Sequence, residues 1–138
     1  MSRECRLDLT VRTYELDQYG VVNNAVYQNY LELARAELLA QVGVDTAAVA
    51  RGGRALALSE LLLKFRRPLV SGDAFQVRTH IAELTGVRAV FAQQVLRMPD
   101  ETVMLDARAE AVFLDERGRP MRIAPEIKAA LSEFLPQP

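Results

Sequence analysis

Residues 23–42 are the longest segment of this chain in which apolar side chains recur at the spacing of a helix. Further Ala and Leu residues fill most of the remaining circumference. A helix that is apolar around so much of its girth has to be covered on several sides by other parts of the fold. Gly43 follows directly and is a suitable residue to end the helix. We therefore expect one long helix around which the rest of the chain is arranged.

The segments on either side of this helix alternate apolar and polar residues, which is typical of half-buried strands. One strand is expected before the helix, at residues 5–15. The strands expected after it cover residues 55–65, whose composition also fits a helix, and residues 75–81, 87–98, 102–115 and 119–123. Asp45 is expected to cap a short helix at 46–51, and Pro125 to begin a closing helix. This order predicts an α+β fold with one antiparallel sheet.

The length of 138 residues fits a single domain covering residues 1–138. A sheet with one enveloped helix leaves its other face and its edges uncovered. Such edges and faces are where identical chains associate. The sequence therefore predicts a dimer or a larger assembly of identical chains.

The charge balance argues against some classes of partner. The net charge is −1, so there is no basic excess of the kind that indicates binding to nucleic acid or to an anionic membrane surface.

No apolar run is long enough to span a bilayer, and the first residues do not form an apolar signal segment. A bacterial cytoplasm is the simplest expected location. The single cysteine, Cys5, excludes a disulfide within the chain.

Several well-known catalytic motifs are absent from the sequence. There is no Gly-x-Ser-x-Gly elbow, which argues against the catalytic triad of an α/β-hydrolase. There is no His-Glu-x-x-His pattern, no pair of cysteines and no glycine-rich nucleotide loop. The single histidine, His80, falls in the middle of a predicted strand, and we interpret it as a structural residue. We therefore expect no metal and no cofactor.

A carboxylate lies just before the predicted long helix. Asp17 is separated from the helix by Gly20, which is free to adopt backbone angles closed to other residues. The first N–H groups of a helix have no partner inside it, and they attract developing negative charge. The N–H groups near Asn23 and Asn24 are therefore candidates for binding an oxyanion, and Asp17 is a candidate nucleophile or base. The local pattern fits equally well an ordinary turn aspartate beside an Asn-Asn helix cap.

Four side chains on the predicted helix have two interpretations each. Tyr27 and Tyr30 lie one turn apart, and their positions favour the core over contact with a substrate. Glu32 and Arg35 are three residues apart, which favours an ion pair on the helix surface over a functional role.

Three cations, Lys64, Arg66 and Arg67, cluster just before a predicted turn. They fit a solvated sheet edge, or a clamp for the phosphate of a ligand. The near-neutral net charge does not exclude a small anionic ligand held by a few local arginines.

Residues 15–27 read Glu-Leu-Asp-Gln-Tyr-Gly-Val-Val-Asn-Asn-Ala-Val-Tyr. This stretch resembles the active-site signature of hotdog-fold thioesterases of the 4-hydroxybenzoyl-CoA thioesterase type. More narrowly, it resembles the plant acyl-ACP (acyl-lipid) thioesterases of the methylketone-synthase type. The likeness covers nearly the whole chain, because it continues at residues 49–51, 55–61, 64–65, 68–69, 71–73 and 122–123.

The resemblance implies a hotdog fold, in which a five- or six-stranded antiparallel sheet wraps around one long helix. It implies homodimers with continuous sheets, and often homotetramers. It also implies hydrolysis of a fatty or 3-oxo-fatty acyl thioester, carried by acyl carrier protein or CoA, without a metal or a cofactor. The product is the free acid.

The resemblance also implies roles for individual residues. Asp17 takes the place of the catalytic carboxylate, and the main-chain N–H of Asn24 that of the oxyanion donor. The acyl channel is expected along the helix and at the subunit interface, lined in part by Tyr27, Leu58 and Ser59.

One difference from the family and one further likeness leave alternatives open. Many relatives carry a histidine at the position of Val21, so no imidazole assists here. Some enediyne polyketide thioesterases look similar around Arg35, which makes this residue a further candidate substrate contact. A polyketide or an aromatic acyl thioester is therefore an alternative substrate, and a non-catalytic acyl-binding hotdog protein is a second alternative. A hotdog dehydratase or hydratase is disfavoured, because the histidine that it needs at the helix entrance is missing.

Overall fold

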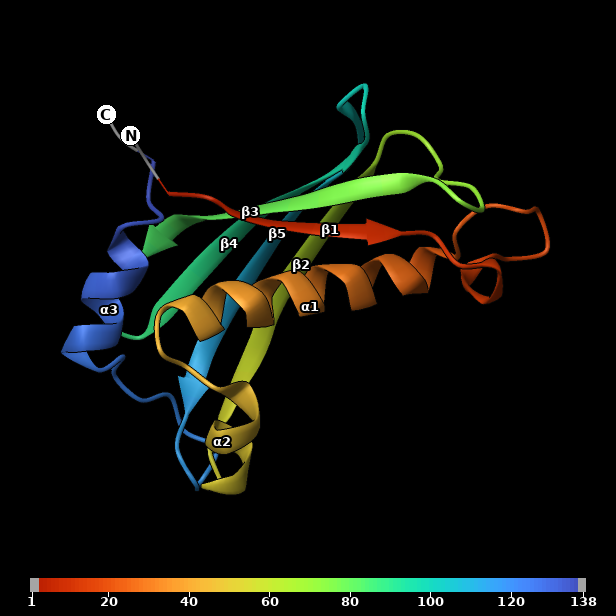
Figure 1. Cartoon of the computed structure of the whole chain (residues 1–138). Helices are drawn as coiled ribbons and strands as arrows, with labels where there is room; N and C mark the ends of the chain where they lie inside the picture. The colour runs from red at the N-terminus through yellow and green to blue at the C-terminus, as the bar shows by residue number, and fades with distance from the viewer. Residues whose placement is uncertain (1–2, 137–138) are drawn as a thin grey trace.

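The computed structural model describes residues 3–136, so the four terminal residues of the expected domain lie outside the described part. Figure 1 shows one sheet with the longest helix lying across one of its faces. The elements follow in the order β1 (Cys5–Thr10), a 3-10 turn (Thr13–Glu15), α1 (Asn24–Gln41), α2 (Thr46–Arg51), β2 (Ala55–Phe65), β3 (Ala74–Leu84), β4 (Arg88–Arg97), β5 (Thr102–Leu114) and α3 (Pro125–Ser132).

The sheet has five strands in the order β1-β3-β4-β5-β2, and every neighbouring pair is antiparallel. Tight connections join β3, β4 and β5, whereas β2 comes early in the chain and pairs with the last strand. The strands β1 and β2 are therefore the two edges. This arrangement confirms the α+β fold with a single antiparallel sheet around one long helix.

Helix α1 begins where the sequence predicts, because Asn23 caps it. The Asn23 side chain accepts a hydrogen bond from the N–H of Ala25 at 2.9 Å. One stripe of the helix packs against β1 and β3. The opposite side is open in the single chain, since Leu33 is 49% exposed. The apolar girth of α1 is thus covered on one side only by its own chain.

Two clusters of buried apolar side chains lie between α1 and the sheet. The cluster near the start of α1 includes Tyr27, Leu31, Phe75 and Leu105. The cluster near its end includes Leu38, Phe91, Leu131 and Phe134, the last two from α3 and the residues after it. A buried polar layer of Arg35, Thr79 and Gln93 separates the two clusters.

One expected strand is shorter than predicted, and another does not form. The first strand ends at Thr10, and residues 13–15 form a 3-10 turn because the Glu15 carboxylate accepts the N–H of Arg12 at 2.8 Å and closes it. Residues 119–123 form no strand. Pro120, which has no N–H to donate, makes only an isolated bridge to Leu114.

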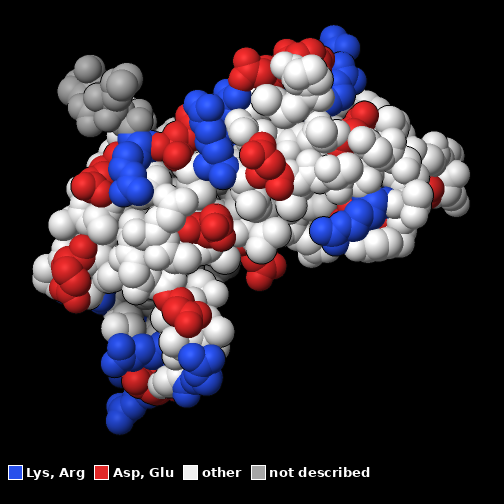
Figure 2. Space-filling model, viewed as in Figure 1, with Lys and Arg blue, Asp and Glu red and all other residues white. Residues whose placement is uncertain are grey.

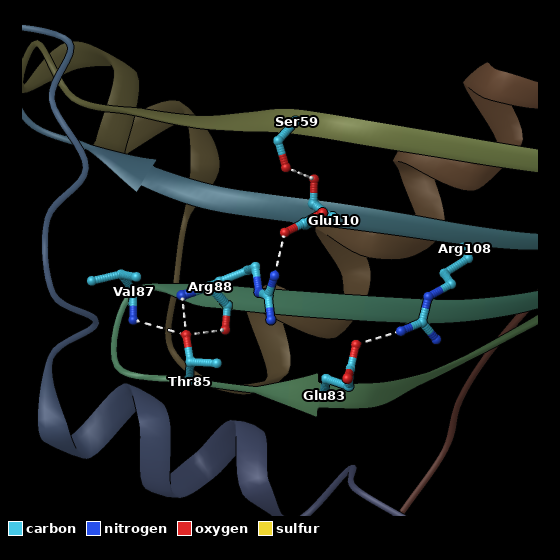
Figure 3. Close-up of polar contacts among 7 residues, drawn as sticks. All are labelled: Ser59, Glu83, Thr85, Val87, Arg88, Arg108 and Glu110. Atoms are coloured by element: carbon cyan, nitrogen blue, oxygen red, sulfur yellow. Dashed lines mark hydrogen bonds and ion pairs between the residues drawn. The ribbon is translucent and has the colours of Figure 1, made fainter.

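The sheet face that points away from α1 is charged. Arg88 of β4 pairs with Glu110 of the neighbouring strand β5 at 2.7 Å, and Arg108 of β5 reaches over β4 to Glu83 of β3 (Figure 3). On the side of the molecule shown in Figure 2, cations and anions are interspersed and form no extended field of one sign. No helix among residues 3–136 combines the length and the apolar character needed to cross a bilayer.

Candidate active site

The segment between the 3-10 turn and α1 is a tight loop. The N–H of Asp17 donates to the Val21 carbonyl at 2.8 Å, and the N–H of Gly20 donates back to the Asp17 carbonyl at 3.1 Å. Gly20 has a φ of +77°, which a residue with a side chain rarely adopts. The Asp17 carboxylate accepts the N–H of Tyr19 at 2.8 Å. The loop therefore holds Asp17, which is half-buried, in a defined place beside Val21.

This loop is joined to the segment that follows β2. The N–H of Val22 donates to the Leu69 carbonyl at 2.9 Å, and Val21 forms a bridge with Val70. The Tyr27 hydroxyl accepts the N–H of Leu69 at 3.1 Å. These contacts bring the start of α1 against residues 66–70, which are far away in the sequence.

A small cavity of about 150 Å³ opens where these segments meet. It contains four of the residues expected at the site, namely Asn24, Tyr27, Arg66 and Arg67. The rest of its wall is formed by Val21, Val22, Phe65 and Pro68. Asp17 is one main-chain hydrogen bond away from this wall, through Val21. The structure therefore brings the loop that carries Asp17, the helix start and the two arginines to one corner of the fold.

The main-chain N–H of Asn24 donates to no other group within residues 3–136. The next N–H, that of Ala25, is taken by the Asn23 side chain. Asn24, which lines the cavity, is thus the residue whose N–H the helix leaves unpaired. An unpaired N–H at the positive end of a helix dipole is suited to bind an oxygen that carries negative charge.

The two tyrosines of α1 both belong to the core, but only Tyr27 reaches the cavity. Its ring packs edge-on against Phe65 with centroids 5.6 Å apart, and burial raises the pKa of its hydroxyl. Tyr30 lies one turn further in. Its hydroxyl donates to the Glu15 carboxylate at 2.8 Å, and burial followed by this hydrogen bond raises its pKa.

The arginines at the cavity differ in their partners. Arg66 pairs with Asp106 at 2.9 Å. Hydrogen bonds from Gln94 and Arg66 lower the pKa of that carboxyl group. Arg67 is exposed and forms no ion pair within the described part of the chain. Arg67 is therefore the cation at this cavity that is free to meet an anionic ligand.

Comparison with known proteins identifies the family. Residues 11–131 match the model of the thioesterase-like superfamily. The chain belongs to this superfamily. The acyl-acyl carrier protein thioesterase ATL3 of Arabidopsis thaliana, named as chloroplastic, is 44% identical over 137 residues, which cover 99% of this chain and 72% of the relative. The long-chain acyl-CoA thioesterase FadM of Escherichia coli K12 is 27% identical, and the match covers 92% of this chain and 96% of the relative.

A solved structure of similar sequence also matches this thioesterase. The hypothetical protein TT1821 from Thermus thermophilus has a TM-score of 0.85 at 32% identity, with 94% of this chain and 98% of that chain covered. These findings confirm the expected hotdog fold and the expected enzyme class, a thioester hydrolase. The expected bacterial cytoplasmic location stays a prediction.

Two other expected site residues of this thioesterase lie at a second cavity, of about 390 Å³, between α1, α2 and β2. Arg35 and Leu58 line it. The predicted surface ion pair between Glu32 and Arg35 is wrong. Arg35 faces the sheet, is only 8% exposed and donates to the Gln93 side chain at 3.0 Å. The helix turns this position inward, and desolvation there lowers the pKa of the guanidinium.

Ser59 lies at neither of these two cavities. It falls where the register of β2 against β5 shifts, and its hydroxyl donates to the Glu110 main-chain carbonyl at 3.3 Å. Figure 3 shows this contact beside the ion pair of Arg88 with Glu110. In the single chain the Ser59 side chain thus links β2 to β5 at the point where their register shifts.

The sequence reasoning missed two groups that position the site. The Glu15 carboxylate holds both the N–H of Arg12 and the Tyr30 hydroxyl, and so joins the loop to α1. Gln93 holds Arg35 in place from the sheet. A signal for Gln93 was present, because this polar residue occupies an inward position between Phe91 and Val95, which are both buried and apolar.

Proposed function

We propose that Asp17 and the main-chain N–H of Asn24 are the catalytic groups of this thioesterase, and that it hydrolyses fatty or 3-oxo-fatty acyl thioesters of acyl carrier protein or CoA. The observation that carries the proposal is the unpaired N–H of Asn24 at the wall of a cavity that Asp17 adjoins. A carbonyl oxygen bound at that N–H would bring its carbon to the side of the fold where the Asp17 loop lies. This is the arrangement that acyl transfer to water requires.

The chemistry follows from these two groups. In one route the Asp17 carboxylate attacks the thioester carbon, the thiolate leaves with a proton from water, and a second water cleaves the mixed anhydride. In the other route Asp17 takes a proton from a water that attacks the same carbon, and the proton then goes to the leaving thiolate. In both routes the carbonyl oxygen becomes an oxyanion that the N–H of Asn24 and the helix dipole stabilise. The products are the free acid and the thiol carrier.

Charge and the names of the relatives support the proposed carriers. Arg66 and Arg67 line the cavity, and a guanidinium is suited to a phosphate oxygen. Both acyl carrier protein and CoA present a phosphopantetheine thiol. The relative at 44% identity is named an acyl-acyl carrier protein thioesterase, which favours acyl carrier protein as the carrier.

The working form of the enzyme is proposed to be a homodimer. The edge strand β2 pairs with β5 on one side only, and it exposes three large apolar side chains, Leu58, Leu62 and Phe65. Pairing of β2 with its copy in a second chain would continue the sheet and cover these side chains. A tetramer would form from two such dimers.

A thiol-release assay tests the proposal. Purified protein is mixed with saturated and 3-oxo acyl thioesters of several chain lengths, on acyl carrier protein and on CoA, and free thiol and free acid are both measured. Release of thiol and acid in equal amounts supports the proposal. Retention of the acyl ligand without thiol release would instead support an acyl-binding protein, and loss of substrate without thiol release a dehydratase or hydratase.

A further inference from the structure

Among residues 3–136, the two most exposed large apolar side chains lie on one short segment. Tyr19 is 79% exposed and Tyr14 is 74% exposed. They stand on either side of Asp17, between β1 and α1. A tyrosine buries about 150–250 Å² when it packs into a core or an interface. Two tyrosines left in solvent forgo much of this contact area, which is typical of a surface that meets a partner.

The segment that carries the two tyrosines is held by its own hydrogen bonds. The N–H of Glu15 donates to the Arg12 carbonyl at 3.0 Å. The N–H of Tyr19 donates to the Asp17 carboxylate at 2.8 Å, and the Tyr14 hydroxyl accepts from Arg12 Nη1 at 2.7 Å. The backbone is thus already ordered while both rings stay exposed. A partner that contacts the rings does not first have to order the loop, and this lowers the cost of binding.

A second segment lies directly beside this one. Val21 forms a bridge with Val70, which is 43% exposed. Val11 exchanges two main-chain hydrogen bonds with the same segment, at 2.9 and 3.2 Å. Both segments lie at the end of the molecule where α1 begins (Figure 1), and both contribute residues to the wall of the candidate active-site cavity. We call residues 11–21 and 66–73 together the rim.

The rim carries three arginines and three carboxylates, but it presents the two kinds of charge differently. The carboxylates of Glu15, Asp17 and Asp73 are half-buried, and each accepts a hydrogen bond from a group of the protein itself. Arg12 and Arg67 are exposed, and within the described part of the chain neither forms an ion pair. The charge that projects from the rim is therefore positive, and a carboxylate on the partner matches it.

The size of the rim distinguishes the two proposed carriers. Both carry a phosphopantetheine arm, but Tyr14 and Tyr19 do not line the cavity, so an arm held in the cavity leaves them in solvent. The nucleotide of CoA is large enough to stack on one ring. A folded protein can cover both rings together with Val70, as the exposed side chains of the rim require.

We infer that the rim is the docking surface for the protein body of acyl carrier protein. Tyr14, Tyr19 and Val70 are its apolar contacts, and Arg12 meets a carboxylate of the carrier. The inference rests on the proposed thioesterase function, and it makes acyl carrier protein the preferred carrier over CoA. The arginines at the cavity remain the contacts for the phosphate that both carriers share.

The first test measures kcat/KM for one acyl group on acyl carrier protein and on CoA. The ratio of the two values is expected to exceed one in the wild type. In the double variant Tyr14→Ala/Tyr19→Ala the value for acyl carrier protein should fall about tenfold or more, while that for CoA stays within about twofold. Arg12→Glu should act in the same direction. An unchanged ratio, or an equal fall on both carriers, would overturn the inference.

Two control variants change exposed residues away from the rim. Val87→Ala trims an exposed apolar side chain in the turn between β3 and β4, and Arg51→Glu reverses an exposed charge on α2. Both should leave the carrier ratio unchanged, and a loss as large as that of the rim variants would show that the rim has no special role. Light scattering on the double variant is expected to give the wild-type mass. A lower mass would make the rim a contact between copies of this chain and overturn the inference.

The second test locates the bound carrier and needs no turnover. Amide hydrogen exchange is measured on Asp17→Asn with and without acyl carrier protein that carries a long-chain acyl group. Slower exchange at the rim supports the inference even if the wild type hydrolyses no thioester, a result that would refute the proposed function alone. Hydrolysis on both carriers, with slower exchange on another surface, leaves the proposed function intact and overturns this inference alone.

Discussion

The hydroxyl of Tyr30 donates to the carboxylate of Glu15 at 2.8 Å, and so joins the second turn of α1 to the segment that leads into the Asp17 loop. Glu15 also accepts the N–H of Arg12, and its carbonyl accepts the N–H of Asn23 at 3.0 Å. One residue thus ties the 3-10 turn, the helix cap and the helix body together. The position of Asp17 relative to the helix start depends on this junction.

Tyr30→Phe tests the junction. The substitution removes a hydrogen bond to a charged, partly buried group, so we expect the free energy of unfolding to fall by about 1.5 kcal/mol. Urea unfolding followed by circular dichroism measures it. Tyr14→Phe is the matched control, because the Tyr14 hydroxyl also holds a charged side chain, that of Arg12, but is 74% exposed. Equal losses in the two variants would contradict a special role for Tyr30.

The same hydroxyl predicts how stability depends on alkaline pH. Burial, and then the hydrogen bond to Glu15, raise the pKa of Tyr30 in the folded protein. The unfolded chain loses this proton near about pH 10, while the folded chain keeps it. Above about pH 10 the folded state therefore binds more protons, and the free energy of unfolding falls as pH rises. Urea unfolding from about pH 8 to 11 should give a shallower fall in Tyr30→Phe, and an identical fall would refute the assignment.

Asp17→Asn tests the catalytic carboxylate. The amide can still accept the N–H of Tyr19, so the fold should survive, but it is neither a nucleophile nor a base. We expect kcat for thioester hydrolysis to fall by about two to four orders of magnitude with an unchanged circular dichroism spectrum. The control is Asp115→Asn, because Asp115 likewise accepts the N–H two residues later, from Arg117 at 2.9 Å, in a turn away from the cavity. Undiminished turnover in the Asp17 variant would remove this residue from the mechanism.

Arg67→Ala tests the proposed contact with the phosphate of the carrier. Because Arg67 has no ion-pair partner within residues 3–136, its loss should leave stability nearly unchanged. We expect KM for the acyl carrier to rise about threefold to tenfold, less so at high salt, with kcat nearly constant. Steady-state kinetics at two ionic strengths measure this, and Arg51→Ala on the exposed surface of α2 is the comparison. A KM equal to that of Arg51→Ala would show that the phosphate binds elsewhere.

Pairing of β2 across two chains predicts both a mass and a pattern of amide protection. Light scattering should give at least about twice the chain mass of 15.4 kDa. Alternate N–H groups of β2, those not bonded to β5, should exchange with solvent slowly, whereas the outward N–H groups of the other edge strand, β1, should exchange fast. A monomeric mass with fast exchange along both edges would exclude the proposed dimer.

Several features of the fold could be predicted because they depend on neighbouring residues. The cap at Asn23, the turn at Gly20 and the cap at Asp45 each involve side chains and backbone groups within three residues of one another. Residues 13–15 look like a strand in the sequence because their alternation continues that of residues 5–10. The hydrogen bond between Arg12 and Glu15 closes a turn instead, and such a bond leaves no mark in the periodicity of the sequence.

The long helix with its cap, the alternating strands and the carboxylate just before the helix could all be recognised in the amino-acid sequence, because they follow from local spacing and backbone preference. Three other features became visible in the folded chain. Arg66 and Arg67 meet Asn24 at one cavity, Arg35 turns inward to Gln93, and Ser59 bonds to β5 at a strand irregularity. The physical reason is that these outcomes depend on which segments pack together across long stretches of chain. The direction of a side chain relative to such a distant partner is set by the packing of the whole core.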